Sequence, residues 1–205
     1  MKGAVLLLLC CSCAAGTQVR RERETEAPDI DAVLDTARAH LGRSAVRVRG
    51  RAFATDCSNF VRGMFWAAGI DLMSEGSAND GNGVRTIFRY VERHGQIHFY
   101  KVPQKGDLVY FDNTWDMNGN GRLDDRLTHV GIVEQVGADG TLQIIHSSNH
   151  GIVREPMNLL RPHDASVNAA LRPKGRRDRA ATPHLMAELF AGFGTVAQRS
   201  RSASR

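Results

Sequence analysis

The chain of 205 residues contains four cysteines, but three of them lie close to its N-terminus. Cys10, Cys11 and Cys13 belong to a segment that resembles an export signal, so the rest of the chain keeps only Cys57. A single thiol cannot form a disulfide inside that domain, so the fold has to rest on a hydrophobic core instead of covalent cross-links. In an exported protein, a leftover cysteine indicates either pairing between molecules or a reactive free thiol.

The residues around Cys57 favour the reactive thiol. Apolar side chains then recur with helical periodicity, at Phe60, Val61, Met64, Phe65 and Ala68. Asp56 is a suitable N-cap, which predicts that Cys57 lies in the first turn of this helix. There the helix dipole and the unpaired N–H groups are expected to lower the pKa of the thiol. The alternative is a buried, inert cysteine.

The N-terminus has the order of a short secretory signal over residues 1–15. Lys2 precedes an apolar run over residues 4–9, and small residues follow. Ser12-Cys13-Ala14 resembles the cleavage site of bacterial lipoprotein signals, which predicts acylation of Cys13 and attachment to the cell envelope. Ordinary cleavage near Ala14 or Ala15 would instead give a soluble exported protein. Residues 16–28 are predicted to be a tether, and no later stretch is long enough to span a bilayer.

The net charge of +5 is concentrated at the C-terminal end of the chain. Residues 173–205 carry seven basic and two acidic side chains, so this segment accounts for the whole excess. We predict a basic, partly disordered tail that favours anionic surfaces of the envelope. A nucleic-acid partner is not expected, because the segment lacks base-reading motifs and interleaved aromatic residues.

Residues 29–172 have the pattern of one α+β domain. Helical stripes follow Asp29, Asp56 and Gly83, and a weaker helix is predicted over residues 185–196. Residues 44–55 are basic and irregular. Short apolar runs at 108–111, 130–133, 142–145 and 151–154 predict strands, with a hairpin turn over 137–140. Helices first and strands afterwards indicate helices packed on an antiparallel sheet, in a domain expected to be monomeric.

Two histidines are placed to assist the thiol of Cys57. His129 begins one predicted strand and His146 ends the next, so the hairpin brings them to the same end of adjacent antiparallel strands. At that distance the two imidazoles can form a hydrogen bond. A thiol nucleophile needs one imidazole as its base and a further polar group that orients that imidazole.

Four segments in order resemble the motifs of the NlpC/P60 cell-wall cysteine peptidases. They are Asp56-Cys57-Ser58-Asn59-Phe60-Val61, Gly106-Asp107-Leu108-Val109-Tyr110-Phe111, His129-Val130-Gly131-Ile132-Val133 and Ile145-His146-Ser147-Ser148. The resemblance covers residues 29–173 and implies a papain-like core that cleaves amide bonds in peptidoglycan stem peptides or cross-links. It implies Cys57 as nucleophile, His129 as base and His146 as the orienting residue, with no cofactor required for the chemistry.

One part of the family pattern is missing. A Tyr-x-x-Gly-Gly segment usually precedes the cysteine and contributes to the substrate groove, whereas residues 44–55 here read Ser-Ala-Val-Arg-Val-Arg-Gly-Arg-Ala-Phe-Ala-Thr. The CHAP amidases share the order of cysteine and histidine, but the Asp-Cys-Ser start and His146 fit NlpC/P60 better. Two other functions remain open: a thiol amidase or acyltransferase on another substrate, and an inactive, calcium-stabilised lipoprotein that binds the envelope.

A second motif precedes His129 and resembles an EF-hand-type calcium loop. Oxygen ligands would come from Asp116, Asn118, Asn120, the Arg122 carbonyl group, and Asp124 or Asp125, with Gly121 at the sharp turn. Position twelve is Leu127 and not the usual glutamate, so a weak, structural Ca²⁺ site is expected. The alternative is a metal-free turn rich in asparagine and glycine.

A zinc site built from Cys57, His129 and His146 is a further alternative, because all three residues are of metal-ligand type. It is disfavoured, since no two of them have the short spacing of a zinc hook.

Overall fold

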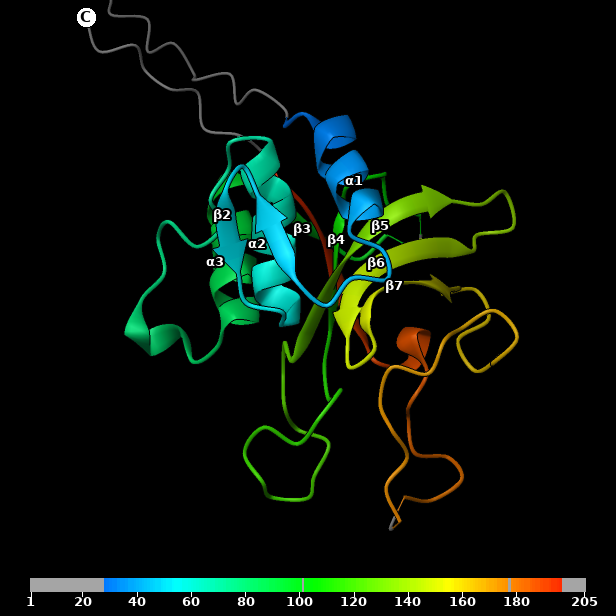
Figure 1. Ribbon diagram of the computed structural model, residues 1–205. Helices are drawn as coiled ribbons and strands as arrows, with labels where there is room; N and C mark the ends of the chain where they lie inside the picture. Colours follow the sequence, from blue (N-terminus) through cyan, green and yellow to red (C-terminus); the bar gives the residue numbers. More distant parts are fainter. Residues whose placement is uncertain (1–27, 101, 177, 197–205) are drawn as a thin grey trace, which may run out of the picture.

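Figure 1 shows the computed structural model, which describes residues 28–100, 102–176 and 178–196. The predicted signal segment, nearly all of the tether, Cys13 and the last nine residues lie outside the described residues. In the part of the chain that the structure describes, no helix is both long and apolar enough to cross a membrane.

Three α-helices form the N-terminal half of the domain, as the sequence predicts. They are α1 (Ile30–Ala39), α2 (Cys57–Ala67) and α3 (Gly83–His94), with a short 3-10 turn η1 (Ala78–Asp80) before α3. Each helix begins at a side chain that accepts a backbone N–H, namely Asp29, Asp56 and Asn82. These caps satisfy N–H groups that have no partner within the helix.

A six-stranded antiparallel sheet forms most of the rest, with the strand order β3-β8-β4-β5-β6-β7. Its strands are β3 (Gln96–His98), β4 (Leu108–Phe111), β5 (His129–Val136), β6 (Leu142–Ser148), β7 (Gly151–Met157) and β8 (Phe190–Thr195). The predicted strands in β4, β5, β6 and β7 are all present, and the predicted hairpin turn joins β5 to β6. The α+β prediction is confirmed.

The sheet buries both of its faces. The helices cover one face in a core that includes Phe60 and Phe65 of α2 and Ile132 of β5. Phe111, Phe193 and other side chains on the opposite face pack under the segment that follows β7, including the 3-10 turn η2 (Met186–Glu188). The α2 helix contacts β5 and β6 directly, so the start of α2 lies against the strands that carry both predicted histidines.

The predicted C-terminal boundary of the domain is wrong. Residues 185–196 do not form a helix, because β8 lies inside the sheet between β3 and β4. Gly194 explains part of this, since an added Cβ there would come within 3.0 Å of both Tyr110 and Val91. A strand glycine with such close neighbours marks a tight approach of packed elements. The domain therefore extends to Val196, and the described part of the predicted tail is folded.

The segment 44–55 is also more regular than the sequence analysis expects. It contains the two-stranded hairpin β1 (Val46–Val48) and β2 (Arg51–Phe53). Val46, Val48 and Phe53 are buried in the core against α2. Alternation of buried and exposed residues over so short a length is easily hidden by three exposed arginines.

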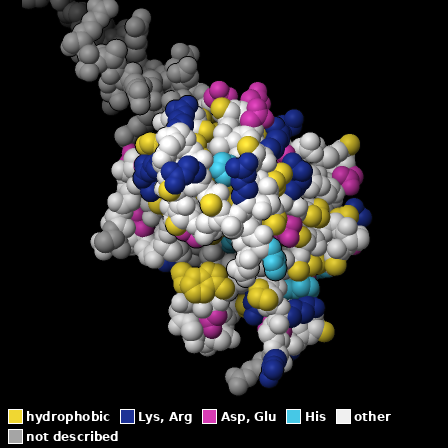
Figure 2. All heavy atoms as spheres, in the orientation of Figure 1, with side chains coloured by type: hydrophobic (Ala, Val, Ile, Leu, Met, Phe, Trp, Pro, Cys, Tyr) yellow, Lys and Arg dark blue, Asp and Glu magenta, His cyan; other side chains and the backbone are white. Residues whose placement is uncertain are grey.

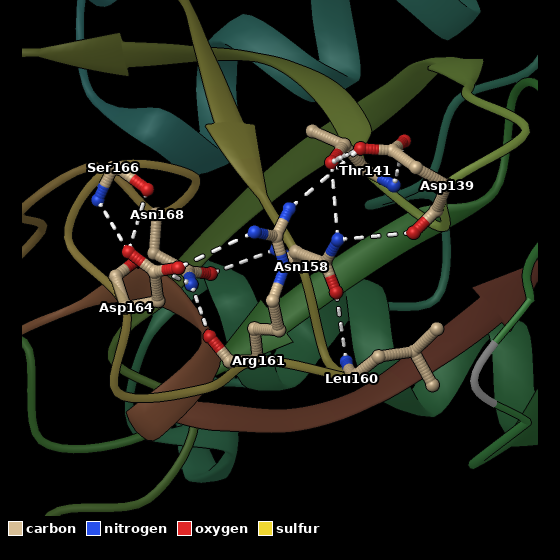
Figure 3. Close-up of polar contacts among 8 residues, drawn as sticks. All are labelled: Asp139, Thr141, Asn158, Leu160, Arg161, Asp164, Ser166 and Asn168. Atoms are coloured by element: carbon tan, nitrogen blue, oxygen red, sulfur yellow. Dashed lines mark hydrogen bonds and ion pairs between the residues drawn. The ribbon is translucent and has the colours of Figure 1, made fainter.

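The segment after β7 is held against the β5–β6 hairpin by a buried asparagine (Figure 3). The Asn158 side chain donates to the Asp139 carbonyl at 3.3 Å and to Thr141 Oγ1 at 3.0 Å. Asn168 donates to the Arg161 carbonyl at 2.7 Å and so closes the loop that follows. These bonds fix the path of the chain toward residues 170–173, which line the cavity described next.

Candidate active site

Cys57 is the first residue of α2, as predicted. Asp56 caps the helix, accepting the Asn59 backbone N–H at 2.9 Å and the Ser58 hydroxyl at 2.6 Å. Burial raises the pKa of Asp56, but these hydrogen bonds outweigh burial and the net pKa is lowered. Asp56 is therefore ionised at neutral pH and keeps the turn that carries the thiol in place.

The pKa of the Cys57 thiol is opposite to the prediction. Burial raises it to about 11, and the nearby charge of Asp56 adds to the rise. Backbone hydrogen bonds from Val130 and from the start of α2 act in the other direction, but they are smaller. The sequence analysis considered the helix dipole and the unpaired N–H groups, whereas desolvation of the charged form is the larger effect here. The resting thiol is protonated at neutral pH.

The two predicted histidines meet across the β5–β6 hairpin. His129 Nε2 and His146 Nδ1 are 2.9 Å apart, and the two rings are nearly perpendicular. Gly131 allows this approach, because an added Cβ would come within 2.7 Å of Ile144 and 3.1 Å of the His146 Cβ. His146 is almost fully buried, at 1% exposed, so its ring has a fixed environment.

A residue that the sequence analysis missed continues this chain of contacts. Glu155 Oε2 on β7 lies 2.9 Å from His146 Nε2. The strand register shows why, since His146 is opposite Val153 and Glu155 is two residues further along the same face. The tight turn that pairs Ser148 with Gly151 could have predicted this register from the sequence.

The two contacts assign the ring hydrogens. A carboxylate only accepts hydrogen bonds, so His146 Nε2 carries a hydrogen and donates it to Glu155. Nδ1 of a neutral His146 then accepts, which requires a hydrogen on His129 Nε2. His129 Nδ1 remains as the nitrogen with a free lone pair.

The protonation state of His129 is set by its surroundings. Burial lowers its pKa well below 6.5, and the neighbouring His146 lowers it further. His129 is therefore neutral at pH 7, which is the form that can accept a proton from a thiol.

Cys57, His129 and His146 line one cavity of about 530 Å³. Its walls come from the start of α2, the ends of β5 and β6, the loop before β5 and the segment after β7. Further lining residues include Thr55, Thr114, Trp115, Ser148, His150, Glu155, Leu171 and Arg172. Trp115 is 54% exposed and marks the side of the opening nearest the predicted calcium loop. The cavity has room for a peptide-sized ligand.

The zinc alternative does not fit this geometry. Both ring nitrogens of His146 have hydrogen-bond partners, His129 on one side and Glu155 on the other. Among the described residues, no three His, Cys, Asp or Glu side chains converge as a metal-binding group.

The predicted calcium loop joins β4 to β5 and has oxygen donors of the kind that Ca²⁺ prefers. The Asp116 carboxylate accepts the backbone N–H groups of Asn120 and Gly121, which folds the loop around it. The amide groups of Asn118 and Asn120 turn toward the Asp124 carboxylate. These hydrogen bonds lower the pKa of Asp124, that from Asn120 most, so this carboxylate is ionised.

Asp125 has a different position from the other predicted ligands. It is 4% exposed, and its carboxylate accepts the Met117 backbone N–H at 3.0 Å. Asp125 therefore closes the loop by hydrogen bonding, and Asp124 is the better placed of the two candidate carboxylates. The loop ends at Leu127 and Thr128, directly before His129, so a cation held by Asp116, Asn118, Asn120, Arg122 and Asp124 would support the start of β5 without taking part in the chemistry.

Comparison with known proteins finds similarity to one family of hydrolases. Residues 48–148 match the CHAP domain family, the cysteine/histidine-dependent amidohydrolases and peptidases. This stretch contains Cys57, His129 and His146. The match is consistent with an NlpC/P60-like peptidase. The sequence motifs had favoured NlpC/P60 over the CHAP amidases.

A curated relative gives weaker support in the same direction. A gamma-D-glutamyl-L-lysine dipeptidyl-peptidase from Bacillus cereus is 22% identical over 143 residues, which is 68% of this chain. The match spans 38% of the length of that protein. No solved structure matches the chain. The domain is a cysteine peptidase or amidohydrolase.

Proposed function

We propose that the protein is an exported cysteine endopeptidase that hydrolyses amide bonds in peptidoglycan stem peptides or cross-links. The observation that carries this proposal is the single cavity that Cys57, His129 and His146 share, with His129 hydrogen-bonded to His146. Attachment to the envelope through Cys13 belongs to the same proposal and depends on residues outside those described.

The reaction would begin with two neutral groups. His129 Nδ1 takes the proton of the Cys57 thiol while the sulfur attacks the carbonyl carbon of the substrate amide. Backbone N–H groups at the start of α2 are suited to stabilise the oxyanion. The imidazolium of His129 then gives its proton to the leaving amine, which breaks the C–N bond and leaves a thioester. Water, deprotonated by His129, hydrolyses the thioester and restores the thiol.

Substitution of Cys57 tests the reaction. Cys57→Ala should lower release of soluble fragments from purified peptidoglycan by about four orders of magnitude or more. The far-ultraviolet circular dichroism spectrum and the melting temperature should stay close to those of the parent, since a half-buried side chain loses only its sulfur. Fragment release by Cys57→Ala at the parental rate would rule out a thiol mechanism.

The fragments also separate this proposal from its main alternative. The CHAP family includes amidohydrolases as well as peptidases, so an amide bond outside the stem peptide is the second candidate. Mass spectrometry of the fragments distinguishes new peptide termini from peptides released whole. Cleavage within the peptide supports the endopeptidase, and release of intact stem peptides supports the amidase.

A further inference from the structure

The β1–β2 hairpin presents a row of arginines on its solvent-facing side. Within residues 36–55 there are five arginines and no aspartate or glutamate. The hairpin buries Val46, Val48 and Phe53 against α2, which leaves its arginines exposed. Figure 2 shows Lys and Arg side chains gathered on this face, over the part where Figure 1 places the hairpin. We call Arg43, Arg47 and Arg49 the arginine surface.

Two of the five arginines already have partners. Arg38 forms ion pairs with Glu134 and Asp35. Arg51 stacks over the rings of Phe53 and Trp66 and also lowers the pKa of Asp71, though less than the ion pair with Arg62 does. The contacts of Arg38 and Arg51 stabilise the fold, so these two arginines need no ligand to account for them.

Arg43, Arg47 and Arg49 are different. Within the described ranges, no carboxylate lies at ion-pair distance from any of the three. The Arg47 guanidinium makes one hydrogen bond, to the Gly50 carbonyl at 3.3 Å. Exposed cations without counter-ions give this part of the surface a positive potential, which favours an anionic ligand.

The backbone at the hairpin tip is a second observation. Arg49 and Gly50 join two paired strands, and both have positive φ angles, 47° and 77°. A two-residue turn of this kind favours Asn-Gly, because asparagine accepts the left-handed conformation more readily than other residues with a side chain. An arginine at this position adds backbone strain as well as charge. Strain retained at an exposed tip indicates a function for the side chain.

The base of the hairpin, at the end opposite its tip, adjoins the catalytic cavity. A smaller hollow of about 260 Å³ is lined by Ser44 and Thr55, the residues that flank the hairpin in sequence. This hollow and the catalytic cavity share Thr55, Ser147, Ser148 and Asn149. A long polymer in the cavity can therefore continue across the hollow onto the hairpin.

We propose that the arginine surface binds the carboxylate groups of the insoluble peptidoglycan polymer beside the strand being cleaved. This inference rests on the proposed function for the choice of polymer. Stem peptides carry repeated free carboxylates, and guanidinium groups bind carboxylates through paired hydrogen bonds. The surface thus holds the enzyme on its polymeric substrate, whereas a short soluble peptide occupies the cavity alone.

The test uses a triple variant, Arg43→Gln, Arg47→Gln and Arg49→Asn, in the full chain. Asparagine is suited to the turn, so Arg49→Asn removes a charge without adding strain, and Arg51 is kept because it stacks on Trp66. The control is Arg93→Gln, Lys105→Gln and Arg161→Gln, which removes the same net charge from exposed positions outside both the hairpin and the predicted basic tail. Binding to purified peptidoglycan is measured by co-sedimentation with Cys57→Ser added, and cleavage of a soluble stem peptide is measured with Cys57 intact.

The triple variant should bind peptidoglycan about tenfold more weakly at low salt, a loss within the range for three exposed ion pairs. Its binding should depend less on salt between about 50 and 500 mM NaCl, because fewer charges are left to screen. Cleavage of the soluble peptide should be unchanged, and the control should bind like the parent. Amidation of the polymer carboxylates should remove the difference between parent and triple variant.

Parental binding by the triple variant, or an equal loss in the control, would overturn the proposal. So would weaker binding to phosphatidylglycerol vesicles with unchanged binding to peptidoglycan, since the surface would then contact membranes. Failure of the proposed function has a different signature. It appears as no cleavage of the soluble peptide by the parent, whereas binding to the polymer is measured independently of catalysis.

Discussion

Replacement of His129 by glutamine is expected to make the stability of the protein less dependent on pH between about 6.5 and about 5. The folded-state pKa of His129 lies well below the unfolded value of 6.5. In this pH range the unfolded chain therefore binds a proton that the folded chain does not bind, and stability is lost as the pH falls. Above pH 6.5 the residue is neutral in both states and contributes no pH dependence.

The loss in the free energy of unfolding depends on how far the pH lies below the unfolded-state pKa of 6.5. Each pH unit changes the free energy of unfolding by about 1.4 kcal/mol until the folded pKa is reached. From pH 6.5 to about pH 5 the loss from this residue is thus up to about 2 kcal/mol. Carboxylates with lowered pKa values, such as Asp56 and Glu134, begin below this range because their unfolded values are 3.8 and 4.5.

Urea denaturation at several pH values, followed by circular dichroism, measures this loss. The His129→Gln variant can be less stable than the parent at every pH, because it loses the contact with His146. This uniform loss does not affect the test. The readout is the slope of stability against pH, which should be smaller than in the parent. His150→Gln is the matched control, since that residue is exposed and should keep the parental slope. Equal slopes in the parent and in His129→Gln would refute the burial argument.

Two further predictions concern residues around the same strands. Glu155→Gln should lower kcat about tenfold. It should also move the acidic limb of the pH profile of kcat/KM to lower pH, because the negative charge of Glu155 favours the imidazolium form of His129 and the variant lacks that charge. An unchanged profile would assign Glu155 a purely structural role. Added Ca²⁺ should stabilise the protein by roughly 1 to 3 kcal/mol at ten- to a hundredfold above its Kd and change the fluorescence of Trp115. Asp116→Ala should remove both effects while a chelator only reduces activity, and a melting temperature that ignores Ca²⁺ would leave the loop as an ordinary turn.

The parts of the site that were predictable have local sequence signals. Asp56 is an N-cap residue and so predicts the helix start that carries Cys57. The glycines over residues 137–140 predict the hairpin turn that brings His129 to His146. Both arguments need only one continuous short stretch of the chain. Glu155 was accessible by the same kind of argument, through the turn after Ser148. It was missed because the register of that short strand was not followed.

The parts that were not predictable depend on distant partners. Strand β8 is held by β3 and β4, which lie about eighty or more residues earlier in the chain. Nothing near Phe190 or Gly194 shows that this partner exists, so the helical composition of 185–191 dominated the prediction. The thiol pKa has the same origin, because burial of Cys57 is produced by packing against Val130 and its neighbours. A sequence shows the helix start but not the desolvation.

The raised pKa of Cys57 and the lowered pKa of His129 together define the energetic problem at this site. In the proposed reaction, proton transfer from Cys57 to His129 turns two neutral groups into an ion pair, and burial opposes each ion taken separately. Attraction between the two ions offsets part of this cost. Two sets of fixed groups offset the remaining desolvation cost. The N–H groups at the start of α2 stabilise the sulfur, and Glu155 acts through His146 on the imidazolium of His129. Glu155 is 31% exposed, so its negative charge remains solvated while its effect reaches a buried ring. The solvated carboxylate of Glu155 thus stabilises the buried imidazolium of His129 through His146. This costs less desolvation free energy than a buried carboxylate would require.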